Sequence, residues 1–249
     1  MSLGILAYKN LFEIGTTAVT DENASFPAVR LYDRDIGLLY KANSAPANSY
    51  ITVDQGAGGT TDVSRLIIPV GHNLNGLVLK LQRSVDNFAT PIDVVTWTQG
   101  DALQISKSFA QPATTRYWRL NITCAGVTPQ MPEIFLSQDV VFSYNPEYGG
   151  PIGTQYNVDR WEVEAGLVRK VKKGNPRRVY RYDWAVLADT DKTVLQAWAD
   201  HLDGLKSFYL CDVAGTWVFC ENMGGALKFT PISYGNWSTS FDFQEVLAS

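Results

Sequence analysis

The chain has 249 residues, of which 45% are hydrophobic, 12% aromatic and only 18% charged, with a formal net charge of -4. This length leaves room for one large domain or two of ordinary size, and the apolar fraction suffices for a buried core. The slight negative charge gives no general reason to expect binding to nucleic acid or to a membrane surface.

No targeting or membrane-spanning segment is predicted. The N-terminus lacks the basic start, long apolar stretch and cleavage site of a signal peptide, and no apolar run approaches the roughly 20 residues that span a bilayer. The three cysteines, Cys124, Cys211 and Cys220, are too few for a disulfide framework, and none forms a C-x-x-C pair. Free thiols in a reducing cytoplasm are therefore expected.

The first half of the chain consists of short apolar runs separated by Gly, Pro, Asn and Ser. The runs are rich in β-branched and aromatic residues and have the length of strands. They cover residues 50–54, 65–70, 77–82, 92–97 and 117–122. Regularly spaced short strands predict a β-sandwich or jelly roll for residues 1–140.

A stretch rich in proline and glycine follows and separates two domains. Pro146, Gly149, Gly150 and Pro151 occur close together. Such residues mark a connector, so residues 141–153 are predicted to be a linker before a second domain at residues 154–249.

The second domain is predicted to begin with one long β-hairpin over residues 156–187. Its turn would be at Gly174-Asn175-Pro176. In the second strand Tyr180, Tyr182, Trp184 and Val186 alternate with polar residues and are expected to share the buried face.

The clearest helix is predicted over residues 188–204. Its apolar stripe at helical spacing consists of Val194, Leu195, Trp198 and Leu202. Thr190 or Asp191 is expected to cap it, and Gly204 to end it in a left-handed turn. Two hairpins follow, around Ala214-Gly215 and Gly235-Asn236, which completes a small α+β unit with an antiparallel sheet.

No catalytic motif is found. The two histidines, His72 and His201, accompany no nucleophile motif, and neither a zinc-protease motif nor a phosphate-binding loop is present. The acidic pairs Asp33/Asp35 and Asp189/Asp191 are typical of turns and helix caps. The chain is therefore predicted not to be an enzyme.

A basic window stands out in the second domain. It contains seven basic residues and no acid: Arg169, Lys170, Lys172, Lys173, Arg177, Arg178 and Arg181. At the tip of a hairpin these residues could be solvated, could contact an acidic surface of another subunit, or could bind phosphates. A subunit contact is preferred over nucleic acid because the whole chain is acidic.

Polar and aromatic residues in loops of the first domain suggest a sugar site. Aromatic rings can stack on sugar faces while short polar side chains bind hydroxyl groups. The candidates are Tyr32, Asp33, Arg34, Asp35, Tyr40, His72, Asn73 and Asn75. The alternative is that they are ordinary turn residues.

The first domain resembles the discoidin-like, or coagulation-factor type C, galactose-binding module. The resemblance covers about residues 10–137 and lies in the order of FPAVRLYDRDIGLLYKA, SYITVDQG, LVLKLQRSVDNF and TTRYWRLNIT. It implies a jelly-roll β-sandwich whose late core strand is TTRYWRLNIT, with Tyr117 or Trp118 inward. Related modules bind sugars, lipids or proteins, or act as scaffolds, and some hold a structural calcium near an acidic turn, for which Asp33 and Asp35 are the candidates.

The second domain is similar to minor and distal tail proteins of long-tailed phages. The similarity covers about residues 154–247 and lies in the order of a hairpin, the helix DKTVLQAWADHLDG, the strands KSFYLCDVAGTWVFCEN and a last strand ending FDFQEV. The positions that carry it are Phe208, Tyr209, Leu210, Asp212, Trp217, Phe219, Glu245 and Val246. It implies a domain that forms a ring, six-fold by family analogy, and continues the tail tube.

The fold class expected is mainly β, with a discoidin-like sandwich followed by a tail-tube-like α+β domain. The preferred hypothesis is a structural protein of a phage tail tip or baseplate, assembled in the host cytoplasm and located in the virion tail. Its partners would be copies of itself, the tube, hub and tape-measure proteins, and a host-surface glycan, with DNA only passing through the ring. The alternative is a carbohydrate-binding or adhesion protein, and a third hypothesis is an accessory domain of a glycan-degrading enzyme. No cofactor is expected apart from the calcium.

Overall fold

The structure is a computed structural model that describes residues 6–59, 62–110, 115–144, 146, 153–156, 158–163, 167–172, 174–212, 214–223 and 227–247. These residues form two compact units. Lys9–Asp139 is called the sandwich unit, and residues 6–8 with Val140–Leu247 are called the α+β unit. The fold class is mainly β, as predicted.

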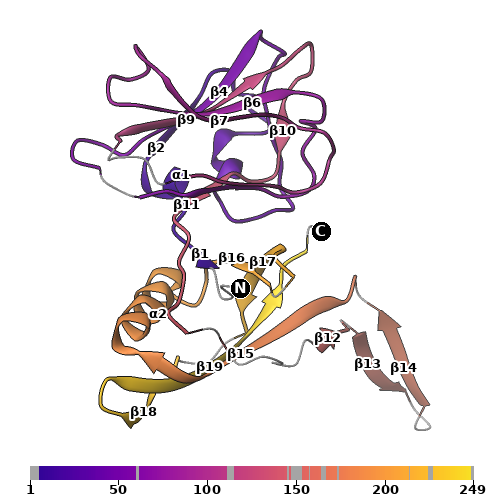
Figure 1. The fold of residues 1–249 in the computed structure, drawn as a ribbon. Helices are drawn as coiled ribbons and strands as arrows, with labels where there is room; N and C mark the ends of the chain where they lie inside the picture. Colours follow the sequence, from indigo (N-terminus) through magenta and orange to yellow (C-terminus); the bar gives the residue numbers. More distant parts are fainter. Residues whose placement is uncertain are drawn as a thin grey trace. The chain divides into compact units, whose positions relative to one another are not determined.

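The sandwich unit consists of antiparallel strands in two main layers (Figure 1). The larger sheet has the order β2 (Thr16–Val19), β4 (Asn48–Asp54), β9 (Tyr117–Thr123), β6 (Val78–Ser84) and β7 (Ile92–Thr98). The smaller sheet has the order β11 (Phe135–Ser137), β5 (Arg65–Ile68) and β8 (Ile105–Ser108). A separate pair joins β3 (Tyr40–Lys41) to β10 (Gln130–Met131). All five predicted strands are confirmed.

The alternation of apolar and polar residues along a strand determines which side chains enter the core of the sandwich unit. In β9 the buried residues are Trp118, Leu120 and Ile122, so Trp118 rather than Tyr117 points inward. They join residues of β5 such as Leu66 and Ile68 in one hydrophobic cluster. Successive side chains of a strand point to opposite faces, and the polar residues of β9 therefore lie on the outer face of the larger sheet.

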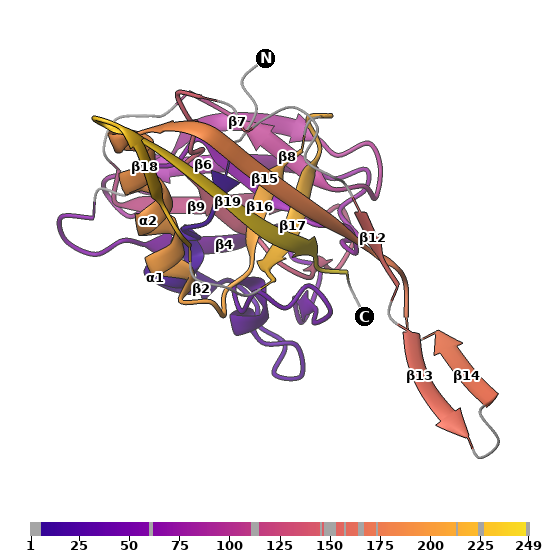
Figure 2. The same ribbon diagram turned by 90° about the horizontal axis from the view of Figure 1, so that it is seen from below.

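The α+β unit is built on a seven-stranded antiparallel sheet (Figure 2). Its order is β1 (Leu6–Ala7), β16 (Phe208–Cys211), β17 (Trp217–Asn222), β19 (Asn236–Glu245), β15 (Arg177–Ala188) and β12 (Gly153–Gln155), and β18 (Thr230–Ser233) pairs with β19. β1 lies in this sheet, whereas residues 1–140 are predicted to belong to the sandwich. Of the predicted linker at residues 141–153, a large part lies outside the described residues.

Helix α2 (Asp189–Leu202) supplies the rest of the α+β core, as its apolar stripe predicts. Trp198 packs against Phe208 and Phe241, with 5.1 Å between ring centroids in each pair. The predicted cap by Thr190 or Asp191 is wrong: Ala188 is the N-cap residue, and the Asp191 carboxylate accepts hydrogen bonds from the Ser143 backbone N–H and hydroxyl instead. The predicted left-handed end of the helix is present, but its C-cap residue is Asp203, with φ of 49°, and Gly204 follows with φ of 67°. No helix of the described residues is long and apolar enough to cross a membrane.

A bulge in β15 corrects the predicted alternation. Tyr180, Tyr182 and Trp184 are buried as expected, but Val186 is 41% exposed and Leu187 is fully buried. The register with β19 shifts between Trp184 and Leu187. An extra residue in one strand reverses the faces beyond it, which the alternation in the sequence does not reveal.

The predicted long hairpin over residues 156–187 is wrong. β13 (Val158–Val163) pairs with β14 (Leu167–Lys172), whereas β15 pairs with β12 and β19. The aromatic face of β15 requires a place inside the large sheet, where Tyr182 and Trp184 pack against Phe243 and Phe241. β13 and β14 form a separate two-stranded ribbon that extends away from that sheet (Figures 1 and 2).

Candidate functional site

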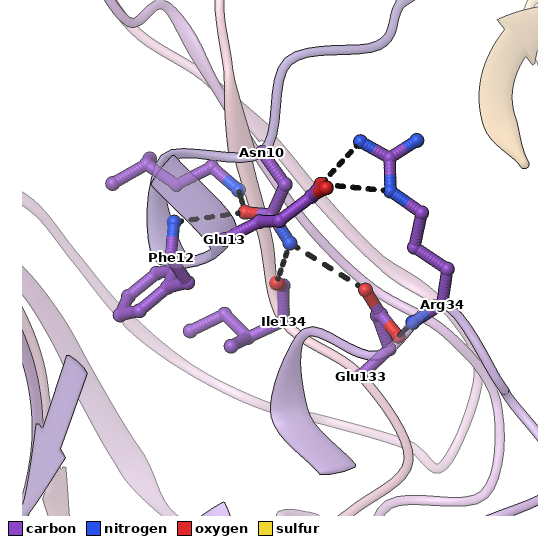
Figure 3. Close-up of polar contacts among 7 residues, drawn as sticks. Asn10, Phe12, Glu13, Arg34, Glu133 and Ile134 are labelled. Carbon is purple, nitrogen blue, oxygen red and sulfur yellow. Dashed lines mark hydrogen bonds and ion pairs between the residues drawn. The ribbon is translucent and has the colours of Figure 1, made fainter. Parts of the chain in front are cut away.

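The side chain of Arg34, a predicted sugar-binding residue, lies inside the sandwich unit. Its side chain is only 6% exposed, and its Nη2 atom lies 2.6 Å from Oε2 of Glu13. Its guanidinium also lies over the Phe135 ring, 5.5 Å from the centroid. Figure 3 shows this ion pair beside the buried Asn10 and Glu133 side chains. A ligand would have to displace Glu13 to reach the guanidinium.

The side chains of three other predicted ligand residues, Tyr40, His72 and Asn73, are also used in contacts within the fold. Tyr40 is fully buried, and burial raises the pKa of its phenol to about 12. His72 is 5% exposed, with Nε2 at 2.8 Å from the Leu103 carbonyl oxygen and Nδ1 accepting from the Leu74 N–H. The Asn73 side chain accepts from the Gln130 N–H and donates to the Thr128 carbonyl. These three residues position the loop beside β10.

The remaining predicted ligand residues are more accessible. Asp33, Asp35 and Asn75 are exposed and Tyr32 is half-buried. Asp33 accepts a hydrogen bond from the Asp35 N–H, and Asp35 accepts one from the Gly37 N–H, as expected of a turn. Although Asp33 is exposed to solvent, the surrounding chain partly desolvates its carboxyl and raises the pKa of that group. No group of three His, Cys, Asp or Glu among the described residues could hold a metal ion, so a calcium here would take its other ligands from the backbone or water.

The basic window is divided between two elements. Arg177, Arg178 and Arg181 lie in β15, where each forms an ion pair within the α+β unit: Arg177 with Glu221 at 3.2 Å, Arg178 with Glu245 at 2.8 Å and Arg181 with Asp183 at 3.4 Å. The Arg178 hydrogen bond lowers the pKa of the Glu245 carboxyl. These three arginines therefore do not lie at the tip of a hairpin.

The other part of the window belongs to the ribbon. Lys170 and Lys172 of β14 are exposed. Arg169 pairs in register with Trp161 of β13, and Lys173 lies outside the described residues. The described part of the window thus presents lysines on a two-stranded ribbon and paired arginines in the large sheet.

The outer face of the larger sandwich sheet carries a row of rings and guanidinium groups that are not among the predicted site residues. We call it the aromatic–arginine row; it consists of Tyr50, Phe88, Arg116, Tyr117 and Arg119. The Arg119 guanidinium lies 4.5 Å from the Tyr50 ring centroid and 4.2 Å from the Phe88 centroid. Arg116 lies 4.7 Å from the centroid of Tyr117. All five side chains are partly exposed.

Neighbouring amide and carboxylate groups hold Arg119 in place. Its Nε donates to Oε1 of Gln82 at 2.7 Å, and Gln82 in turn donates to Asp93. The hydrogen bond from Gln82 is the main reason why the pKa of the Asp93 carboxyl is lowered. Burial lowers the pKa of Arg119. Within the described part of the chain, no carboxylate lies within ion-pair distance of Arg119, whereas Arg116 is paired with Asp54 at 2.6 Å.

Part of this row could be predicted from the alternation of residues in the sequence. Thr52 of β4 and Gln82 of β6 both pair in register with Arg119 of β9, so these three residues lie on the same face of the sheet. Tyr117 and Arg119 are two residues apart and share that face. Phe88 lies in a loop, however, and its contact with Arg119 follows only from the tertiary structure.

No family model and no curated protein sequence matches this chain. Among solved structures, a chitosan-binding module of a chitosanase/glucanase from Paenibacillus sp. IK-5 has 20% identity and a TM-score of 0.45, and the match covers 52% of this chain and 98% of that one. A carbohydrate-binding module produced by Clostridium perfringens has 19% identity and a TM-score of 0.42, covering 52% and 99%.

A fucosidase from Ruminococcus gnavus, in complex with fucose, has 15% identity and a TM-score of 0.45, and the match covers 53% of this chain but only 27% of the enzyme. At TM-scores below 0.5 these similarities assign neither a family nor a ligand to this chain.

Proposed function

We propose that the chain is a non-enzymatic carbohydrate-binding protein whose sandwich unit recognises a glycan on the aromatic–arginine row. The observation that carries this proposal is the Arg119 guanidinium held between the Tyr50 and Phe88 rings on an open sheet face. Rings can cover the apolar face of a sugar, and a fixed guanidinium can donate hydrogen bonds to its hydroxyl or carboxylate oxygens.

The row is suited to binding because its polar groups are fixed before a ligand arrives. Gln82 accepts a hydrogen bond from the Nε–H of Arg119. The two terminal nitrogens of Arg119 can therefore donate to other acceptors. Fixing a binding group in advance reduces the entropy lost on association. The accessible loop residues Tyr32, Asp33, Asp35 and Asn75 are the competing location for the same function.

Glycan-array binding by the full chain, followed by titration calorimetry with the best glycan, tests the proposal. We expect Tyr50→Ala and Arg119→Met to weaken binding about tenfold or more, a loss of about 1.4 kcal/mol. Tyr32→Ala should have little effect, and Tyr234→Ala removes a fully exposed ring of the α+β unit as a matched control. Circular dichroism and denaturation of each variant check that it folds. Loss of binding in Tyr32→Ala alone would move the site to the turn, and no binding to any glycan would reject the function.

The second candidate function is a structural component of a phage tail tip that self-assembles, located in the virion tail. The two-stranded ribbon of β13 and β14 favours this second candidate function. Among the described strands β13 and β14 pair only with each other, and Trp161 and Val171 are 43% and 47% exposed. An isolated two-stranded ribbon is at best marginally stable in water, and a partner that covers it would stabilise it. Native mass and negative-stain microscopy test this candidate: a closed ring near six copies supports it, and a monomer at all concentrations contradicts it.

A further inference from the structure

The α+β unit contains an acidic cavity of its own. The cavity has a volume of about 440 Å³ and lies between the C-terminal half of α2 and strand β19. Trp198 and Phe241 provide aromatic walls, and Asp200, Asp203 and Asp242 provide three carboxylates. No lysine or arginine is among the described residues that line it, although Nε of Arg181 lies 3.9 Å from Oδ1 of Asp242. The indole N–H of Trp198, a residue only 1% exposed, has no hydrogen-bond partner within the described part of the chain.

The ribbon formed by β13 and β14 carries charge opposite to that of the cavity. In its register Lys172 is opposite Val158 and Lys170 is opposite Arg160, so these four positions share one face. The other face contains Trp161 and Val171, both exposed, with Arg169 and Asp159 at the positions opposite them. The ribbon therefore presents two exposed lysines on one face and two exposed apolar side chains on the other.

We propose that the ribbon of one copy docks at the acidic cavity of a second copy. This inference rests on the self-assembly of the second candidate function and names the acceptor site for it. Lys170 and Lys172 would approach the carboxylates of Asp200 and Asp242. Donor and acceptor are different surfaces, so the contact is head-to-tail, the type that generates a ring or a filament.

The occupant is a second copy rather than the same chain because the ribbon extends away from the sheet whose strand β19 forms one wall of the cavity (Figures 1 and 2). No residue of the ribbon lines the cavity of its own chain.

A paired charge reversal tests the contact. The first variant, Lys170→Glu with Lys172→Glu, has an acidic ribbon and an acidic cavity. The second, Asp200→Lys with Asp242→Lys, has a basic ribbon and a basic cavity, and both aspartates are exposed. By sedimentation velocity on the full chain, each variant alone should assemble at least about tenfold more weakly than the unaltered protein, because like charges then face each other.

Mixing the two variants should restore assembly, since each ribbon then meets a cavity of opposite charge. Lys228→Glu reverses an exposed lysine of the same unit and should leave assembly unchanged. An unaltered protein that stays monomeric would reject self-assembly itself. Assembly that is insensitive to the cavity variant, or a mixture that fails to assemble although both variants are folded, would reject only this docking site.

Discussion

Asn10 shows how one side chain can connect distant parts of the sandwich unit. It is fully buried at the N-cap of α1 (Leu11–Ile14). Its Oδ1 accepts from the N–H groups of Phe12 and Leu136, both at 3.2 Å, and its Nδ2 donates to the Ile134 carbonyl at 2.8 Å and to Glu133 at 3.4 Å. The side chain therefore attaches α1 to the segment that enters β11.

Replacement of Asn10 by alanine is expected to lower the free energy of unfolding by about 2–4 kcal/mol, because it leaves several buried polar groups without partners. Urea denaturation of the full chain measures the change. Asn75→Ala is the matched control, since Asn75 is exposed, and it should cost less than about 0.5 kcal/mol. Equal effects of the two variants would show that the buried hydrogen bonds of Asn10 contribute little.

Glu133 makes the stability of the sandwich unit depend on pH. Burial raises the pKa of its carboxyl well above the ordinary value of 4.5, and the nearby Asp33 adds to the effect. Between the ordinary and the raised pKa, the folded chain keeps a proton that the unfolded chain releases. The free energy of unfolding therefore falls as the pH rises through this interval, by at most about 1.4 kcal/mol per pH unit.

We expect Glu133→Gln to flatten this part of the pH profile because glutamine does not titrate. Urea midpoints between about pH 5 and pH 8 measure the slope. The control is Asp62→Asn, which changes an exposed carboxyl of the same unit and should leave the slope as it is. A profile with the same slope in Glu133→Gln would mean that the buried carboxyl is already ionised in this range.

At the level of elements, Gly15 determines how closely α1 and β2 approach β4. A Cβ atom at this position would lie 2.5 Å from Cγ2 of Val53 and 2.8 Å from the Asp54 carbonyl oxygen. The backbone there is extended, with φ of -90°, so the constraint is space rather than conformation. No such close neighbour exists at Gly100, where nothing lies within 4 Å.

Gly15→Ala is therefore expected to destabilise the sandwich unit by about 1–3 kcal/mol through overpacking. Gly100→Ala should be neutral or stabilise it by up to about 1 kcal/mol, because alanine restricts the unfolded chain. Thermal unfolding of the two variants compares them directly. If both shifted the midpoint equally, β4 would have moved away to accommodate the methyl group.

Elements with a regular pattern could be predicted from the sequence. The strands of the sandwich unit and α2 follow from alternation and helical spacing, because burial of Leu120 or Leu195 depends mainly on local periodicity. The partner of a strand depends on the whole fold instead. β14 therefore pairs with β13 rather than with β15, and the bulge before Leu187 moves Val186 to the solvent side.

The candidate sites were harder to predict for the same reason. Arg34 and His72 have the residue types of a sugar site, yet their partners Glu13 and Leu103 come from other segments and use their polar groups inside the fold. Phe88 and Arg119 are 31 positions apart and meet only through tertiary structure. Sequence patterns identify which residues can bind, whereas the folded chain determines which remain accessible.

For the whole molecule, the division into two units predicts two unfolding transitions. Each unit has its own hydrophobic cluster: one contains Ile51, and the other contains Leu6, which is only 1% exposed. Leu6 belongs to the second cluster although it precedes the sandwich unit in sequence, since β1 pairs with β16. We expect Leu6→Ala to lower only the transition of the α+β unit and Ile51→Ala to lower only that of the sandwich unit, each by about 2–5 kcal/mol.

Differential scanning calorimetry of the full chain, with each variant scanned under the same conditions, separates the two transitions. The assignment does not depend on which one occurs first, because each variant marks its own unit. A single transition that both variants shift would mean that the units unfold together. A Leu6→Ala variant that shifts the sandwich transition would mean that the N-terminal strand stabilises the unit that follows it in sequence rather than the sheet with which it pairs.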